Sequence, residues 1–198
     1  MDVVVIGGAT GALDVLKRLV AALPSNFPAA VVVVLHPDER HPKSTIAALM
    51  KATPLDVSYA DDGEGLRRGR VYLAPPDRHL VFDAAGHVHL DDGPKVRHHR
   101  PAADRLFKSA ARVFGREVIG VLLSGSGTDG TDGLIAIKGA GGVSIVQSPS
   151  DAQEPGMPTS GLLNDSPDHV PLAEELGPLI QQLVEQRAQR ANRRTVAL

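Results

Sequence analysis

Runs of apolar residues alternate with amphipathic stretches along most of the chain. The run from 3 to 6 is β-branched and ends in glycines, and apolar residues then recur at spacings of three and four from Leu13 to Leu23. A strand that passes through a tight glycine turn into a helix is the first half of a βαβ unit. The same alternation predicts strands at 29–35, 57–60, 71–74, 117–123 and 142–147, and helices at 44–51, 102–114, 133–139, shortly after 158, and at about 172–188.

The segment from 79 to 90 departs from this alternation. Two short apolar runs, 79–82 and 87–90, flank a turn at 83–86 and predict a β-hairpin. We therefore expect a three-layer α/β fold, in which a mostly parallel sheet lies between helices, with one antiparallel hairpin. A loop through His41 and Pro42 should join the second strand to its helix, and the last helix should break or restart at Gly177-Pro178. Its end carries Arg190, Arg193 and Arg194, a basic tail more typical of a solvated helix end than of a binding site.

Composition narrows the class of protein. The 198 residues, 42% of them hydrophobic, suit one domain spanning 1–198, with the C-terminal helix and tail from about 172. A net charge of -2 gives no reason to expect nucleic acid or an anionic membrane as the main partner. There are no cysteines, no apolar stretch of membrane-spanning length and no signal-peptide pattern, so we expect a cytoplasmic protein without membrane insertion.

The first glycine turn does not fit a cofactor motif. A dinucleotide fingerprint needs glycines where this chain has Gly7, Ala9 and Ala12, and an acidic residue at the end of the second strand, where it has His36. Neither a P-loop lysine nor a zinc spacing is present. The histidines at 87, 89, 98 and 99 could be imagined as a metal cluster, but no carboxylate spacing supports one and solvated hairpin histidines are the favoured interpretation. We therefore expect no cofactor and no metal.

His36 and Asp129 are the more informative pair. A histidine that ends a buried strand is often only a satisfied structural residue. However, the carboxyl ends of parallel strands lie together, so His36 should approach the first turn, and Asp129, in a second glycine turn after another strand, should reach the same crevice. An aspartate that orients a histidine beside a strand-end turn is the supporting part of a nucleophilic triad.

Six motifs occur in order along the chain, and all are found in one family. They are Ile6-Gly7-Gly8-Ala9-Thr10-Gly11-Ala12, Val34-Leu35-His36, the segment Ala74 to Leu80, the segment Arg100 to Ala111, the segment Leu123 to Gly130, and Gly156-Met157-Pro158. On these motifs the chain resembles the catalytic domain of CheB-type protein-glutamate methylesterases, from about Val3 to Ile180.

The resemblance implies hydrolysis of glutamate γ-methyl esters on the cytoplasmic helices of chemoreceptors, with possible deamidation of glutamine, by a Ser-His-Asp site. The triad positions correspond to Ala9, His36 and Asp129, so the nucleophile position holds alanine. Without the hydroxyl no acyl-enzyme can form, and loss of a triad nucleophile can remove about six decades of kcat. The resemblance places His79 and Met157 as lining residues of the site, and Ser126 in the turn of the aspartate. Backbone N–H groups at the helix N-terminus near Thr10 and Gly11 are candidate donors to the oxyanion.

Several alternatives follow from the alanine. It could be an engineered substitution, or a natural loss that leaves a silent homologue acting as a binding module for a receptor helix or a related signalling protein. Ser124 or Ser126 could replace the nucleophile, or His36 could activate water, whereas Thr10 is a poor substitute. Ser126 also stands where the family usually has methionine.

The resemblance bears on regulation and on one more motif as well. Family members usually carry an N-terminal receiver domain; this chain starts almost at the first strand, so we expect no receiver domain within it. Such regulation is then absent, or is supplied by a partner such as a separate receiver protein or by a trimmed segment. Arg100 and Asp104 should position a helix start or a receptor segment, the helix start being the favoured interpretation.

Overall fold

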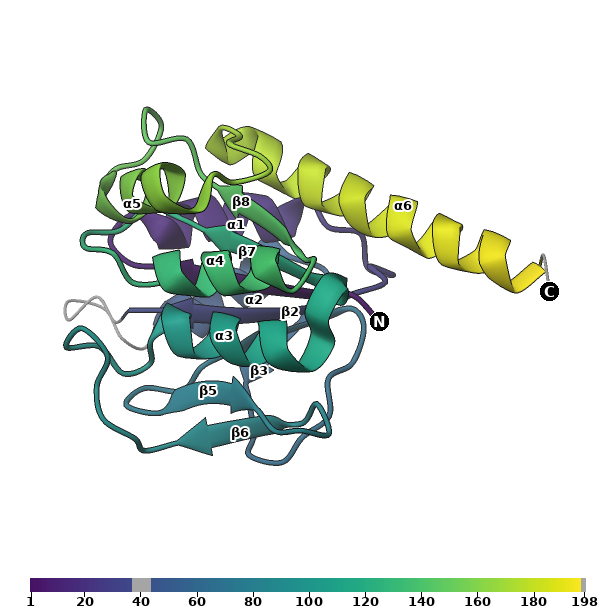
Figure 1. Ribbon diagram of the computed structural model, residues 1–198, viewed down its shortest axis with the longest axis horizontal. Coiled ribbons are helices and arrows are strands. Elements are labelled where there is room, and N and C mark those ends of the chain that lie inside the picture. Colours follow the sequence, from purple (N-terminus) through teal and green to yellow (C-terminus); the bar gives the residue numbers. More distant parts are fainter. Residues whose placement is uncertain (37–43, 197–198) are drawn as a thin grey trace.

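A six-stranded parallel sheet forms the centre of the computed structural model, which describes residues 1–36 and 44–196 (Figure 1). The strands stand in the order β3-β4-β2-β1-β7-β8. Their bounds are β1 Val3–Gly8, β2 Ala30–Leu35, β3 Asp56–Tyr59, β4 Arg70–Leu73, β7 Val118–Leu122 and β8 Val143–Val146. β1 and nearly all of β2 are buried, because helices cover both faces of the sheet, and this explains their almost unbroken runs of valine.

Successive side chains of the central strand point to opposite faces and join two separate cores. Val4 and Ile6 pack with α1 (Ala12–Ala21), α2 (Ser44–Ala52) and α6 (Leu176–Val196). Val3 and Val5 pack with α3 (Ala103–Phe114), α4 (Thr131–Gly139) and α5 (Gly156–Asp165). The three-layer α/β prediction is therefore confirmed (Figure 1).

The predicted hairpin is present and forms a sheet of its own. β5 (His79–Phe82) pairs antiparallel with β6 (Val88–Asp91). Leu80, Phe82 and Val88 are buried in the same core as α3, and the Phe82 N–H donates to the Ser109 hydroxyl on that helix at 3.1 Å. The hairpin thus extends the layer that covers β2 and β4 beside α3 (Figure 1).

The C-terminal helix differs from the prediction at both ends. A short 3-10 turn, η2 (Ala173–Glu175), precedes α6, which continues to Val196 without a break. Pro178 lies in the first turn, where its missing N–H needs no partner. Gly177 lets α6 approach α1 closely, since a Cβ there would lie 2.6 Å from Ala22 Cβ. The expected end near 188 was wrong, because the Gln-, Arg- and Ala-rich sequence up to 194 consists largely of good helix formers.

The predicted loop through His41 and Pro42 lies outside the described residues.

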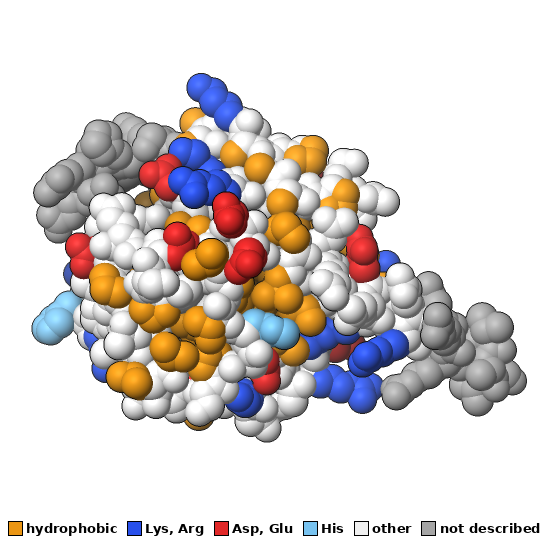
Figure 2. Space-filling model, turned by 90° about the horizontal axis from the view of Figure 1, so that it is seen from above, with side chains coloured by type: hydrophobic (Ala, Val, Ile, Leu, Met, Phe, Trp, Pro, Cys, Tyr) orange, Lys and Arg blue, Asp and Glu red, His pale blue; other side chains and the backbone are white. Residues whose placement is uncertain are grey.

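Figure 2 looks onto the side where α5 and α6 lie, and it shows hydrophobic side chains gathered near the centre of that face. Exposed apolar residues on α5 and on the segment that follows it are Leu162, Leu163, Val170 and Leu172. None of the helices within the described part of the chain is both long and apolar enough to span a membrane.

Candidate active site

Three strand ends meet at one edge of the sheet, because β1 lies between β2 and β7. The N–H of His36 donates to the carbonyl of Gly8 at 3.0 Å, and the N–H of Ala9 donates to the carbonyl of Ser124 at 2.9 Å. The chain passes from β1 to β2 on one side and returns to pair β7 on the other side, so the strand order reverses at β1. In open parallel sheets such a reversal leaves a crevice at the carboxyl ends of the strands, where ligands bind.

His36 and Asp129 form a buried pair at this edge. Nε2 of His36 lies 2.7 Å from Oδ2 of Asp129, and the two residues are 8% and 2% exposed. The carboxylate also accepts hydrogen bonds from the N–H groups of Ala103 at 2.7 Å and Asp104 at 3.0 Å, in the first turn of α3. Burial raises the pKa of Asp129, but the hydrogen bonds from His36, Asp104 and Ala103 outweigh burial and hold that pKa below its ordinary value. Asp129 is therefore ionised at neutral pH.

The bond to Asp129 determines the chemistry of the other ring nitrogen. Because an ionised carboxylate can only accept, Nε2 of His36 carries the hydrogen, and in the neutral form of the ring Nδ1 holds the lone pair. Nδ1 is buried, and no described group donates to it. An unpaired buried acceptor costs stability, and here it leaves a basic nitrogen available to take a proton.

The turn after β1 carries Ala9, Thr10 and Gly11. Gly11 has φ 82° and directly precedes α1; a Cβ there would lie 2.7 Å from Gln153 Cβ and 2.8 Å from Ser124 Oγ, so only glycine fits. Thr10 is exposed, and Ala9 is partly buried. Among the described residues, nothing accepts a hydrogen bond from the N–H groups of Thr10 and Gly11. Free backbone donors at a helix N-terminus can stabilise a negative oxygen.

The two serines of the turn after β7 have different surroundings. Ser124 is fully buried; its hydroxyl donates to the carbonyl of Thr10 at 2.7 Å and accepts from the N–H of Glu154 at 3.0 Å. This hydroxyl links the two glycine turns, which argues against Ser124 as a replacement nucleophile. Ser126 is exposed at the tip of its turn.

Met157 packs directly against the turn after β7. It is fully buried in the first turn of α5, and its N–H donates to the carbonyl of Gly125 at 2.7 Å. A Cβ on Gly125 would lie 2.3 Å from Met157 Sδ and 2.8 Å from Ala9 Cβ. Gly125 therefore allows Met157 and the turn that carries Ala9 to close around it.

Two residues from the motifs have structural partners. His79, at the start of β5, is fully buried and its Nε2 donates to the carbonyl of Pro94 at 3.0 Å; burial lowers its pKa. Asp104 accepts a hydrogen bond from the N–H of Gly133 in α4 at 2.8 Å, and burial raises its pKa. These contacts give Asp104 the role at a helix start that its sequence position favoured, and they tie His79 to a loop rather than to the His36–Asp129 pair.

Sequence reasoning considered His99 only as a possible metal ligand and missed its place beside His36. Its ring stacks on the ring of His36, with centroids 3.7 Å apart and planes 8° from parallel. Burial lowers the pKa of His99, and the neighbouring His36 lowers it further. The available signal was its position immediately before Arg100, where the motif that carries α3 begins.

The two histidines of the hairpin, His87 and His89, lie beside carboxylates. Within the part of the chain that the structure describes, no three His, Cys, Asp or Glu side chains converge in a way that could hold a metal ion. Nδ1 of His87 lies 3.6 Å from Asp83 and Nδ1 of His89 lies 3.2 Å from Asp62, and all four side chains are about half exposed. They are solvated side chains of the hairpin.

Known proteins are similar to this chain over most of its length. The family described as CheB methylesterase matches residues 4–180. A protein-glutamate methylesterase/protein-glutamine glutaminase 2 from Anaeromyxobacter dehalogenans is 38% identical over 183 residues, which cover 92% of this chain and 53% of that protein. A putative protein of the same description from Leptospira interrogans is 32% identical over 182 residues, covering 92% of this chain and 94% of the relative.

The fold is similar to a solved structure as well. The crystal structure of the Thermotoga maritima CheB methylesterase catalytic domain superposes with a TM-score of 0.88 at 35% identity, covering 92% of this chain and 98% of that one. The chain spans about half the length of the two Anaeromyxobacter relatives that it matches over 183 and 171 residues.

Proposed function

The chain belongs to the CheB methylesterase family, and we propose that its site recognises glutamate γ-methyl esters, and the related glutamine side chains, on the cytoplasmic helices of chemoreceptors or of a related signalling protein. His36 is the general base, Asp129 orients it, and Ala9 occupies the nucleophile position. The proposal therefore describes a site that retains its base and its orienting carboxylate but lacks the hydroxyl that starts the reaction.

The observation that carries this proposal is the 2.7 Å contact between His36 and Asp129 at the point where the strand order reverses. A buried His–Asp pair can also be purely structural. However, no described group donates to Nδ1 of His36, and, unlike the buried Nδ1 of His79, this nitrogen belongs to a ring whose other nitrogen contacts an ionised carboxylate. The unpaired nitrogen and the ionised carboxylate together fit a base that works on a substrate or a nucleophile.

The chemistry that a serine at position 9 would perform is defined by these groups. The serine oxygen would attack the ester carbonyl while its proton passes to Nδ1 of His36, and the imidazolium would then protonate the departing methoxide, which leaves as methanol. Water would hydrolyse the acyl-enzyme by the same proton path, releasing the glutamate carboxylate. The N–H groups of Thr10 and Gly11 are the candidate donors to the oxyanion. Alanine can perform none of the nucleophilic steps.

The direct test is methanol release from methylated receptor, measured for the unaltered chain and for Ala9→Ser. We expect the unaltered chain to be near background and Ala9→Ser to be faster by about four to six decades, because the supporting groups are already in place. Ala9→Ser combined with His36→Gln is the matched control, and it should fall back to background.

Other results would support the other two candidate functions. If Ala9→Ser is folded but inactive, and both forms bind the receptor helix, the domain is a binding module. If the unaltered chain already releases methanol, another nucleophile or a water activated by His36 carries the reaction. Ser126→Ala then separates these two, since only the first would lose activity.

A further inference from the structure

The stack between His99 and His36 restrains the one side chain on which the proposed chemistry depends. Asp129 holds the Nε2 edge of the His36 ring at 2.7 Å, and His99 covers one ring face at a centroid distance of 3.7 Å. Rotation of the His36 ring about its last torsion would break both contacts. Edge and face together therefore fix the plane in which Nδ1 carries its lone pair.

The charge state of His99 suits this place. Burial is the main cause that lowers its pKa; His36, His98 and Lys95 lower it further, and Asp129 opposes them. His99 is therefore neutral at neutral pH. A neutral aromatic face can lie against His36 both when that ring is neutral and when it becomes an imidazolium, since a π-face attracts a cation.

The backbone that carries His99 is held in a costly conformation. His99 and Val96 exchange two backbone hydrogen bonds, at 2.8 and 3.0 Å. Between them Arg97 has φ 49° and His98 has φ 71°, both in the left-handed region. Neither is glycine, and residues held in this region occur where the surrounding structure imposes them, often at functional sites. The tight turn therefore fixes the position of the His99 backbone, from which its ring extends.

One anchor ties this turn to the segment that carries Asp129. The Arg97 guanidinium donates to the Thr128 hydroxyl at 2.7 Å and to the Asp132 carboxylate at 3.2 Å. Thr128 is the residue before Asp129, and Asp132 lies in the first turn of α4. The turn that carries His99 and the segment that carries Asp129 are therefore linked directly by the hydrogen bonds of Arg97.

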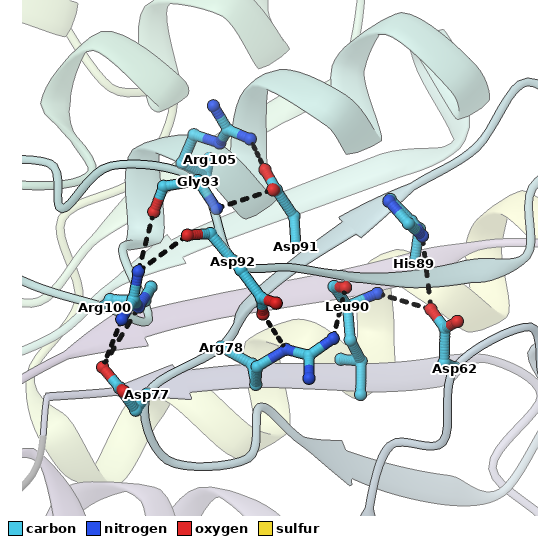
Figure 3. A network of polar contacts seen from close by, with 10 residues as sticks. All are labelled: Asp62, Asp77, Arg78, His89, Leu90, Asp91, Asp92, Gly93, Arg100 and Arg105. Atoms are coloured by element: carbon cyan, nitrogen blue, oxygen red, sulfur yellow. Dashed lines mark hydrogen bonds and ion pairs between the residues drawn. The ribbon is translucent and has the colours of Figure 1, made fainter.

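A second anchor holds the other end of the loop. Arg100 donates to the Asp77 carboxylate at 2.9 Å and to the Gly93 carbonyl at 3.0 Å (Figure 3). Arg105, in the first turn of α3, pairs with Asp91, the last residue of β6 in the neighbouring hairpin. Arg100, which the sequence placed at a helix start or a receptor segment, thus fixes the base of the loop.

We propose that His99 is a positioning residue, which holds the ring of His36 in the plane where Nδ1 is free to take up a proton. The catalytic consequence rests on the proposed function, whereas the restraint on the ring does not. The two can therefore be tested separately.

The restraint is tested on the unaltered chain by NMR of the His36 ring. Exchange of the Nε2 proton with water and ¹³C relaxation of the ring carbons should report a rigid, protected imidazole. In His99→Ala we expect exchange about tenfold faster and a more mobile ring, and in His99→Phe we expect values close to those of the unaltered chain, because phenylalanine restores the stack. His98→Asn is the matched control, since asparagine tolerates the left-handed region and His98 is not in the stack.

An unchanged His36 ring in His99→Ala would overturn the inference. So would equal mobility in His99→Ala and His99→Phe, because the effect would then not come from the stacked ring. Amide spectra of each variant show whether it is folded, and a variant that has lost the fold is replaced by His99→Tyr or His99→Leu, which keep more of the buried volume with and without a ring.

The catalytic consequence is measured in the Ala9→Ser background. His99→Ala should lower kcat about tenfold with KM little changed, and His99→Phe should recover most of it, since a small misplacement of a base is costly in rate. A loss of activity that comes from a higher KM with kcat unchanged would overturn the positioning role. So would a kcat that phenylalanine does not restore. If Ala9→Ser is itself inactive, the proposed function fails, and the NMR measurements on the unaltered chain still decide the restraint.

Discussion

The turns after β1 and β7 share a backbone plan but differ in the chemistry they present. Each leads from a buried strand to a helix whose preceding residue is a glycine in the left-handed region, Gly11 at φ 82° and Gly130 at φ 92°. The turn after β7 presents Asp129, whose carboxylate accepts three hydrogen bonds. At position 9, the turn after β1 presents the methyl group of Ala9. Both turns have the glycine that packing demands although the side chains that they present differ, so packing and side-chain chemistry are specified separately.

The largest expected effect breaks the chemistry of the β7 turn. In the Ala9→Ser background, Asp129→Asn should lower kcat by about four decades, because an amide cannot hold His36 in the tautomer that leaves Nδ1 basic. Asp104→Asn is the matched control: it is also buried at the start of α3, but it bonds Gly133 rather than His36. Steady-state methanol release gives both values, and similar losses in the two variants would contradict the assignment of Asp129.

A smaller effect tests the packing of the β1 turn. Gly11→Ala should destabilise the protein by about 2–4 kcal/mol, because it adds left-handed strain to a clash with Gln153 and Ser124. Gly127→Ala has a similar φ of 85° but nothing within 4 Å of the added Cβ, so it should cost only about 1 kcal/mol. Urea unfolding measures both, and equal costs would show that strain alone, without close packing, requires the glycine.

The smallest effect is on the pH dependence of stability. The pKa of Asp129 lies below its ordinary value of 3.8 in the folded state, so its contribution is present above that value and is lost as the pH falls through the folded pKa. The pKa of Asp104 is raised by burial, so its ionisation costs stability as the pH rises from 3.8 through the folded pKa.

The two asparagine variants should therefore change the acid side in opposite directions. Asp129→Asn should reduce the loss of unfolding free energy that occurs as the pH falls below about 4. Asp104→Asn should remove the loss of unfolding free energy that occurs as the pH rises above about 4. Urea titrations between about pH 2.5 and 7 measure both slopes. Slopes that change in the same direction would contradict the opposite shifts.

Much of the fold followed from local patterns. The valine runs of β1 and β2, the glycine turns and the hairpin at 79–90 all lie where short-range periodicity placed them. The sequence could also bring His36 towards Asp129, because parallel strands deliver their ends to one edge. Sequence patterns did not predict the side-chain contacts that depend on packing between distant parts of the chain.

His99 and Ser124 illustrate that limit. The stack of His99 on His36 depends on a turn with two non-glycine residues in the left-handed region, which no local preference of Arg97 or His98 predicts. Ser124 looked like a candidate nucleophile, but its partners Thr10 and Glu154 come from distant parts of the chain. The break expected at Gly177-Pro178 was wrong for a local reason, since this pair lies in the first turn of α6, where a proline is compatible with a helix start.

The dual attachment of Asp129 has an evolutionary consequence. The carboxylate that contacts the imidazole also accepts hydrogen bonds from the first two N–H groups of α3. The same group therefore stabilises the N-terminus of that helix. A lineage released from selection for turnover can lose the serine hydroxyl at little structural cost, whereas losing the aspartate would also unpin a core helix. We expect drift in silent members of such a family to erase the nucleophile first and the acid last.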